Sequence, residues 1–223
     1  MHSSAYVSED TIEAKSHLWL DRIRQAVAPR PQLQLDLSRS ALLVIDMLRY
    51  FAAARGRCYL PATAAIVPRI AKLIKVWRHH GALVVYTQHC HKGAHDLGML
   101  GRFFSDHIDC NEPQAQIIGA LEPLPSEPIF RKITYDAFLG TQLESTLRQK
   151  KVEQVLITGV LTHMCCDTTA RAAFCRGFEV YVPVDATASS TEELHVGALL
   201  GLADSVAIPM STVEILTRCP TKA

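Results

Sequence analysis

The sequence has no excess of one charge, no long apolar run and no leader-like segment. Its 23 lysines and arginines nearly balance its 22 aspartates and glutamates, so the net charge is +1. A nucleic acid or an anionic membrane surface is therefore not expected as a partner. No apolar run reaches the ~20 residues that span a bilayer. The N-terminal stretch contains early acids and no apolar core, so we expect no secretory signal there.

The cysteines also lack the patterns that mark common cysteine-rich sites. Seven cysteines occur at irregular spacing and without a C-x-x-C pair, which argues against a disulfide framework, a zinc site or thioredoxin-like chemistry. We expect reduced thiols in a cytoplasmic protein. The 223 residues, of which 48% are hydrophobic and 20% charged, suffice for one sizeable soluble domain with a buried core.

Residues 1–36 are predicted to form an N-terminal helical arm, and residues 37–223 the main domain. Apolar residues recur at helical spacing from Thr11 to Val27, and the following Pro-Arg-Pro segment cannot continue a helix. We expect the arm to pack on the main domain or on a second subunit. The alternative is a loosely held tail.

Short apolar runs alternate with helical patterns through the main domain. The predicted strands are continuous apolar runs, as in strands buried on both faces of a parallel sheet; they cover residues 41–45, 83–87, 155–158, 179–184 and 205–208. This alternation predicts an α/β fold with three layers, α-β-α, and a mainly parallel central sheet. Residues 92–126 form a long irregular connection, which we expect to cover a site.

Polar or reactive side chains follow the predicted strands. They are Asp46, His89, Lys132, Cys165 and Asp185. Because the carboxyl ends of parallel strands meet at one edge of the sheet, these side chains could share one crevice. We expect Asp185 to be a structural cap rather than a reactive group.

Asp46, Lys132 and Cys165 form a candidate catalytic set. A carboxylate can take the proton of a thiol, and an ammonium group stabilises the thiolate. Cys165 is predicted in the first turn of a helix over residues 163–176, where unpaired N–H groups and the helix dipole favour the thiolate. Each residue also has an ordinary alternative: a cap for Asp46, a surface charge for Lys132 and core packing for Cys165.

Five motifs follow one another along the main domain. They are ALLVIDMLRYF (41–51), VVYTQHCH (84–91), FRKITYDAFLGTQL (130–143), VLITGVLTHMCCDTTARAAFCRGFEV (155–180) and VPVDATAS (182–189). With these motifs in this order, the chain resembles the isochorismatase-like cysteine hydrolases over residues 37–217. The resemblance implies Asp46 as general base, Lys132 as its lysine partner and Cys165 as nucleophile. It also implies a cis peptide at Val160-Leu161, with the N–H groups of Leu161 and Cys165 forming the oxyanion hole. Members of this family are usually dimers or larger, so a homodimer or homotetramer is expected.

Cys165 decides between the activities of this family. Isochorismatases proper carry a small non-nucleophilic residue at its position, so a thiol there favours cleavage of a C–N bond in a small amide, ureide or carbamoyl compound through a thioester. Because of His163-Met164, a vinyl ether hydrolase remains the alternative, with Asp46 as proton donor. A thiol sensor using Cys165 and Cys166, or a non-catalytic relative, is the remaining option; otherwise we expect Cys166 to serve only packing.

The substrate-binding residues expected from the sequence lie near these motifs. They are His89, His91, Tyr135, Phe138 and His163. The resemblance extends to nicotinamidases, which bind a divalent metal through Asp-x-His and a further His. Here His89 stands at the position of that Asp, so the carboxylate ligand is missing. We therefore expect a small-molecule substrate, no metal and no cofactor.

Overall fold

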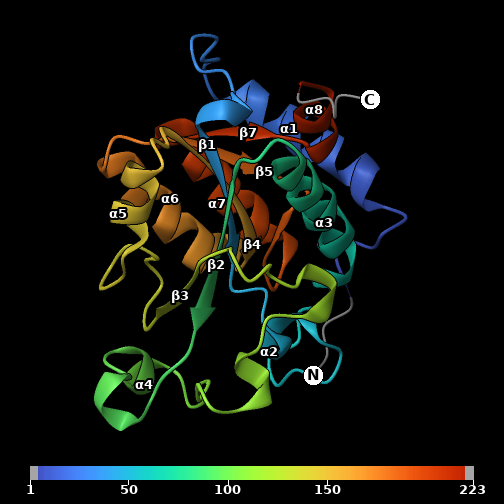
Figure 1. Cartoon of the computed structure of the whole chain (residues 1–223). Coiled ribbons are helices and arrows are strands. Elements are labelled where there is room, and N and C mark those ends of the chain that lie inside the picture. The colour runs from blue at the N-terminus through green and yellow to red at the C-terminus, as the bar shows by residue number, and fades with distance from the viewer. Residues whose placement is uncertain (1–4, 219–223) are drawn as a thin grey trace.

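The computed structural model describes residues 5–218, which form one parallel sheet with helices on both faces (Figure 1). The strands are β1 (Ser40–Ile45), β2 (Leu83–His89), β3 (Ile129–Lys132), β4 (Gln154–Val160), β5 (Glu179–Pro183), β6 (Thr187–Ala188) and β7 (Ala207–Met210). Their order is β3-β2-β1-β4-β5-β7, with β6 paired to the end of β4, and every pairing is parallel. The predicted three-layer α/β fold is confirmed.

The helices connect these strands. The α-helices are α1 (Ile12–Ala26), α2 (Arg49–Ala52), α3 (Thr63–His79), α4 (Leu100–Phe103), α5 (Leu143–Gln149), α6 (Asp167–Cys175), α7 (Glu192–Ser205) and α8 (Thr212–Arg218). Short 3₁₀ turns are η1 (Leu37–Arg39), η2 (Ala94–Asp96), η3 (Pro113–Ala115) and η4 (Gly119–Leu121), and η5 (Thr162–Cys166) is a π-helical turn.

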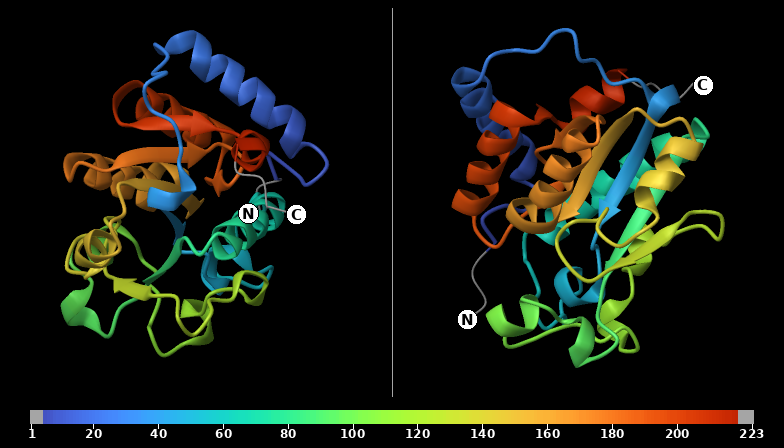
Figure 2. Two further views of the ribbon diagram at one scale, coloured as in Figure 1. Left: turned by 45° about the horizontal axis from the view of Figure 1, so that its top comes forward. Right: turned by 90° about the vertical axis from the view of Figure 1, so that its left-hand side faces the viewer.

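The connections explain which helix covers which face. The step from β1 to β2 runs toward the β3 edge, whereas the steps from β4 to β5 and on to β7 run the other way. Right-handed crossovers therefore place α3 on one face and α6 and α7 on the other. Figure 2 shows this division, with α5, α6 and α7 on one side of the sheet and α3 on the other. Helices thus cover the apolar central strands on both faces of the sheet.

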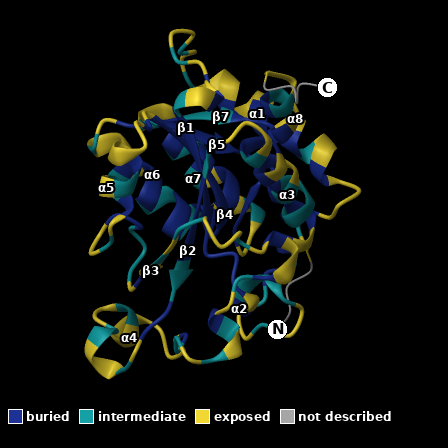
Figure 3. Cartoon of the chain, viewed as in Figure 1, coloured by how far each residue is buried: buried dark blue, intermediate teal, exposed yellow. Residues whose placement is uncertain are grey.

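The middle of the sheet is the core of the molecule. Every residue of β1 and β4 is buried, as expected of continuous apolar strands with a neighbour on each side and helices above and below. Figure 3 shows the buried residues concentrated in the sheet and on the inner sides of the helices, whereas the segment around α4 is mostly exposed. Among residues 5–218, no helix is both long and apolar enough to cross a membrane.

The N-terminal arm packs on the main domain. Helix α1 lies against α7 and buries one face, formed by Ile12, Ser16, Trp19, Leu20 and Ile23. Its apolar residues belong to the same core as the sheet. Of the two packing partners expected for the arm, the main domain is thus the one seen for this helix.

Two local features differ from what the sequence predicts. The helix after β4 begins as the π turn η5 and becomes α-helical only at Asp167. The two-residue strand β6 was not predicted, because so short a strand has no readable period.

Candidate active site

Four strand ends bring Asp46, His89, Lys132 and Cys165 together. Asp46 follows β1, His89 and Lys132 end β2 and β3, and Cys165 lies in η5 after β4. Asp185, at the same edge, is not part of this group: its carboxylate accepts from the backbone and hydroxyl of Thr212 and pairs with Arg69 at 3.0 Å. Its predicted structural role agrees with these contacts.

Lys132 lies at the centre of the group. Its side chain is fully buried, and Nζ is 2.7 Å from Asp46 Oδ2, 3.1 Å from Cys165 Sγ and 2.8 Å from Thr134 O. His89 Nδ1 lies 3.2 Å from the same Nζ. A buried ammonium group needs such a set of acceptors, because burial without partners would cost several kcal/mol. Lys132 thus holds the carboxylate and the thiol on either side of one positive charge.

Asp46 is held by its backbone as well as by Lys132. Its backbone N–H donates to Thr87 Oγ1, and this hydroxyl donates back to Asp46 Oδ1 at 2.6 Å. The residue has φ 48°, in the left-handed region that aspartate tolerates better than most residues. Oδ2 meets no donor among the described residues at hydrogen-bonding angles, although Nζ is close. This oxygen remains able to accept a proton.

The charges of the group follow from burial and from the Lys132 ammonium. Burial alone would raise the pKa of Asp46, but Lys132, His89 and Thr87 more than offset it, so the pKa lies below its ordinary value. The pKa of Lys132 is raised, because Asp46 and Cys165 outweigh the opposing effect of burial. Burial raises the pKa of the Cys165 thiol to about 12, against the lowering by Lys132. At neutral pH the carboxylate is charged and the sulfur carries its proton.

Burial opposes one effect that was expected from the sequence. Unpaired N–H groups and the helix dipole at a helix N-terminus were expected to favour the thiolate of Cys165. Instead the residue lies inside the π turn, where it is 4% exposed, and the loss of solvation exceeds the effect of the positive charge. A base is therefore needed to form the thiolate, and the Asp46 carboxylate, with Sγ within 4.8 Å, is close enough.

The nucleophile turn, residues 159–162, shapes the backbone before the thiol. The Val160-Leu161 peptide is cis, as the resemblance implied. Gly159 has φ +106°, and a Cβ there would lie 2.0 Å from Ile45 O on the neighbouring strand, so only glycine fits. Leu161 O accepts from the N–H groups of Met164 and Cys166. Its own N–H has no acceptor within residues 5–218.

Cys166 is separated from this group, as predicted. It is fully buried, and its sulfur lies 4.0 Å from Thr158 O on β4. Burial raises the pKa of its thiol well above the ordinary value. These contacts make it part of the core. Arg171 and Asp167, also on this segment, form an exposed ion pair at 3.0 Å.

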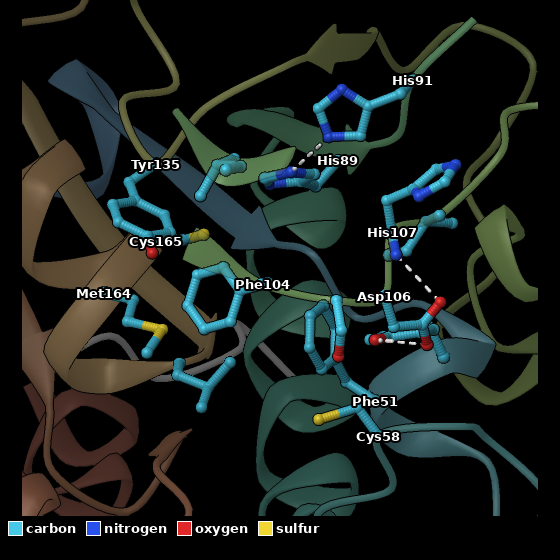
Figure 4. A pocket seen from close by; sticks show the side chains of 15 residues that line it. Phe51, Cys58, His89, His91, Phe104, Asp106, His107, Tyr135, Met164 and Cys165 are labelled. Atoms are coloured by element: carbon cyan, nitrogen blue, oxygen red, sulfur yellow. Dashed lines mark hydrogen bonds between the residues drawn. The ribbon is translucent and has the colours of Figure 1, made fainter. Parts of the chain in front are cut away.

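A mostly apolar cavity of about 250 Å³ opens onto Cys165. Of the five predicted substrate-binding residues, His89, His91 and Tyr135 line it. Figure 4 shows Cys165, Tyr135, Met164 and Phe104 on one side, with Phe51, Cys58 and Asp106 across from them. The other lining residues are Tyr50, Leu100, Ser105, His107, Ile108 and Leu161.

Phe138 and His163 do not line the cavity, contrary to expectation. Phe138 is 5% exposed and stacks on Phe178, with the Arg176 guanidinium over its ring. His163 turns toward β6 and its Nδ1 lies 2.9 Å from Ser189 Oγ. Both belong to segments next to the cavity, but the sequence could not show which way their side chains point.

The cover loop, residues 91–109, supplies much of the cavity wall, and sequence reasoning did not identify its individual residues. Leu100, Phe104, Ser105, Asp106 and Ile108 come from this loop. The only sequence signal was its length and irregularity. Arg57 fixes it: the guanidinium binds Asp106 Oδ2 at 3.0 Å, Glu112 Oε2 at 2.6 Å and His107 O at 2.7 Å.

A disulfide between Cys90 and Cys110 closes the base of the cover loop. This corrects the expectation that the cysteines are all free thiols. The two residues are brought side by side because His91 pairs with Asp109, with His91 N donating to Ile108 O and Cys110 N to His91 O. Their spacing in the sequence could not reveal this pairing across an irregular loop.

His89 and His91 are not arranged as a metal site. His89 Nδ1 faces the Lys132 ammonium, so this nitrogen is the acceptor and the ring proton lies on Nε2. That Nε2–H points at His91 Nε2, 3.2 Å away. Burial and Lys132 lower the pKa of His89 to about 3, so the ring stays neutral. The His89 nitrogens are both engaged, and a cation beside Lys132 would be repelled. These residues do not fit a divalent metal.

Comparisons with known proteins identify relatives of this chain. The chain is 36% identical to Nicotinamidase 3 of Arabidopsis thaliana over 167 residues, which cover 74% of the chain and 80% of that protein. The structure of a cysteine hydrolase from Pseudomonas syringae pv. phaseolicola 1448A superposes with a TM-score of 0.81 at 26% identity, covering 86% of this chain and 97% of that one. An N-carbamoylsarcosine amidase from Thermoplasma acidophilum gives a TM-score of 0.67 at 25% identity, over 78% of this chain and 96% of that one.

The sequence profile of the Isochorismatase domain matches residues 40–214, which include the four strand ends and the nucleophile turn. Together with the parallel sheet and these relatives, this match shows that the chain belongs to the isochorismatase family of hydrolases.

Proposed function

We propose that this protein is a cysteine hydrolase that cleaves a C–N bond of a small, uncharged amide, ureide or carbamoyl compound through a thioester. The observation that carries the proposal is the pairing around Lys132. A charged Asp46 carboxylate and a protonated Cys165 thiol contact the same buried ammonium group at the end of an apolar cavity. This arrangement provides a base, a nucleophile and the charge that stabilises the thiolate.

The reaction begins with transfer of the Cys165 proton to Asp46, as Sγ bonds to the substrate carbonyl carbon. The carbonyl oxygen becomes an anion, which the N–H groups of Leu161 and Cys165 bind. The C–N bond then breaks, and the leaving nitrogen takes the proton from Asp46. Water next gives a proton to Asp46 and attacks the thioester; Sγ leaves and regains its proton. The products are an acid and ammonia or an amine.

The cavity indicates the size and charge of the substrate. Its volume of about 250 Å³ is below the 300–1,000 Å³ usual for drug-sized ligands. Its described lining contains no lysine or arginine, and its one acid, Asp106, is neutralised by Arg57. A small uncharged molecule fits these walls better than a carboxylate, which would lack a cationic partner.

Two observations disfavour the vinyl ether alternative. That reaction needs Asp46 to be protonated before the substrate reacts, whereas Lys132 and its other partners lower the pKa of this carboxyl. In the thioester reaction, Asp46 starts as the carboxylate and receives its proton from Cys165. Isochorismate also carries carboxylates, for which the described cavity walls offer no lysine or arginine.

The test is ammonia or amine release across a panel of small amides, ureides and carbamoyl compounds. Cys165→Ala should lower turnover by several orders of magnitude. The adjacent Cys166→Ala is the matched control and should keep most of the activity. Mass spectrometry of the working enzyme should find the acyl group on the peptide that carries Cys165. Equal loss in the two variants would refute the assignment.

A further inference from the structure

A buried hydrogen bond links the nucleophile turn to a histidine far along the chain. Thr162 and His195 are both fully buried, and Thr162 Oγ1 lies 2.8 Å from His195 Nδ1. His195 belongs to α7, which packs against η5. Its other ring nitrogen, Nε2, is 3.0 Å from Val184 O. None of the steps of the proposed reaction uses this histidine.

The direction of these two bonds follows from their partners. A carbonyl oxygen can only accept, so His195 Nε2 carries the ring proton and donates to Val184 O. Burial lowers the pKa of His195 to about 4, so the ring is neutral and Nδ1 is an acceptor. The Thr162 hydroxyl must therefore donate to Nδ1. His195 thereby connects the nucleophile turn to the backbone at the end of β5.

The Leu161 N–H lies between two anchored residues. On one side, Val160 belongs to β4 and pairs with Ala188 of β6. On the other side, Thr162 is held through its side chain by His195. The Leu161 N–H itself has no acceptor within the described residues. Its direction is set by these two neighbours and by the Leu161 carbonyl, which accepts from the N–H groups of Met164 and Cys166. Of these anchors, Thr162 alone depends on a side-chain contact.

The N-terminal arm supports His195 from the other side. The Trp19 ring stands edge-on to the imidazole, with centroids 4.7 Å apart, and the Tyr6 ring lies at 5.9 Å. Trp19 Nε1 donates to Glu192 Oε1 at 2.7 Å, and Lys15 pairs with Glu192 Oε2 at 2.6 Å. Glu192 begins the helix that carries His195. The arm thus packs over the histidine and is bound to its helix.

We propose that His195 is a positioning residue that aims the Leu161 N–H at the substrate oxyanion by fixing Thr162, and that the N-terminal arm keeps it in place. This inference rests on the proposed cysteine hydrolase mechanism. Oxyanion stabilisation depends on donors placed in advance of the reaction, and a displacement of about 1 Å can cost on the order of 10²-fold in rate.

Two reagents separate oxyanion positioning from general reactivity of the thiol. p-Nitrophenyl acetate acylates Cys165 through attack on a carbonyl, forming an oxyanion and releasing p-nitrophenolate. Iodoacetamide alkylates the same sulfur by displacement of iodide, without an oxyanion. Both reactions need Asp46 to take the thiol proton. The acylation burst and the alkylation of the Cys165 peptide, followed by mass spectrometry, measure the two rates.

Thr162→Val removes the hydroxyl and keeps the shape of the side chain. We expect acylation to slow by about 10- to 100-fold, while Cys165 alkylation stays within about twofold of wild type. Thr162→Ser, which keeps the hydroxyl, should restore most of the acylation rate. Thr158→Val is the matched control. It removes a different buried hydroxyl, which lies on β4 and donates to Leu43 O, and it should leave both rates near wild type. His195→Phe should reproduce Thr162→Val.

The outcomes are distinct. Unchanged acylation in folded Thr162→Val, or an equal fall in acylation and alkylation, would overturn the positioning role. A wild-type protein that p-nitrophenyl acetate acylates normally, with the expected effect of Thr162→Val, but that hydrolyses no amide, ureide or carbamoyl compound, would overturn the proposed function and leave the positioning role supported. A wild-type protein that the ester cannot acylate at all would overturn both.

Discussion

Replacing Lys132 by methionine should expose how much the fold depends on the central charge of the site. Methionine has a similar length and no charge, so the Asp46 carboxylate would be left buried without its ion-pair partner. Asp46 and Lys132 are both fully buried and only 2.7 Å apart. Breaking such a pair from one side costs about 3–5 kcal/mol, and we expect this loss in the free energy of unfolding at pH 7.

A second substitution removes the buried charge that Lys132→Met leaves unpaired. In the double variant Asp46→Asn, Lys132→Met, neither of these two positions carries a buried charge, and the oxygen of the introduced asparagine side chain can still accept from Thr87. Replacing a whole buried pair is often nearly neutral. The double variant should therefore regain most of the lost stability, to within about 1–2 kcal/mol of wild type, yet remain inactive because it has no base.

The pH dependence of stability provides an independent check that Lys132 stabilises the charged form of Asp46. In the wild type the pKa of Asp46 is lowered, so its stabilising contribution is present above its unfolded pKa of about 3.9 and is lost as the pH falls through the lower, folded value. Without Lys132, burial raises this pKa, so protonation at acid pH relieves the variant. The difference in stability between wild type and Lys132→Met should therefore be largest at pH 7 and shrink toward pH 4.

Urea unfolding of the three proteins at pH 7, 5.5 and 4.5 measures these differences by linear extrapolation. A double variant no more stable than Lys132→Met, or a gap that widens on acidification, would refute the description of Lys132 as the charge that keeps Asp46 ionised.

Three further predictions follow from the surroundings of the site. Gly159→Ala should lower the free energy of unfolding by at least about 2 kcal/mol, because its Cβ would meet Ile45 O at 2.0 Å at a positive φ. Thermal unfolding measures this loss of stability. A Tm within a degree of wild type would contradict the prediction. Arg57→Ala should raise KM about tenfold (about 1.4 kcal/mol), because it frees Asp106 and His107 of the cover loop. The control Arg39→Ala breaks ion pairs with Glu153 and Glu179 and should leave KM unchanged. Equal KM values in the two variants would refute the role of Arg57 in holding the cover loop. Peptide mapping without reductant should recover Cys90 linked to Cys110, and Cys110→Ala should lower Tm; separate, alkylated peptides would show that the bond is absent.

The architecture and the reactive group could be predicted from the sequence because both depend on local patterns. Continuous apolar runs such as residues 41–45 are stable only as buried strands, and their alternation with helices permits few topologies. Parallel strands end at one edge, so Asp46, Lys132 and Cys165 could be expected to meet there although they are far apart in sequence. The structure places Lys132 Nζ within 3.1 Å of both partners.

Side-chain direction and protonation could not be predicted in this way, because they depend on neighbours that are distant in sequence. Phe138 turns into the core against Phe178, and the Cys90–Cys110 bond joins the two ends of an irregular loop. Sequence alone determined that Asp46, Lys132 and Cys165 reach the site. Only the tertiary structure decided that the Cys165 proton stays on sulfur, because that state reflects the balance between burial and the single charge of Lys132.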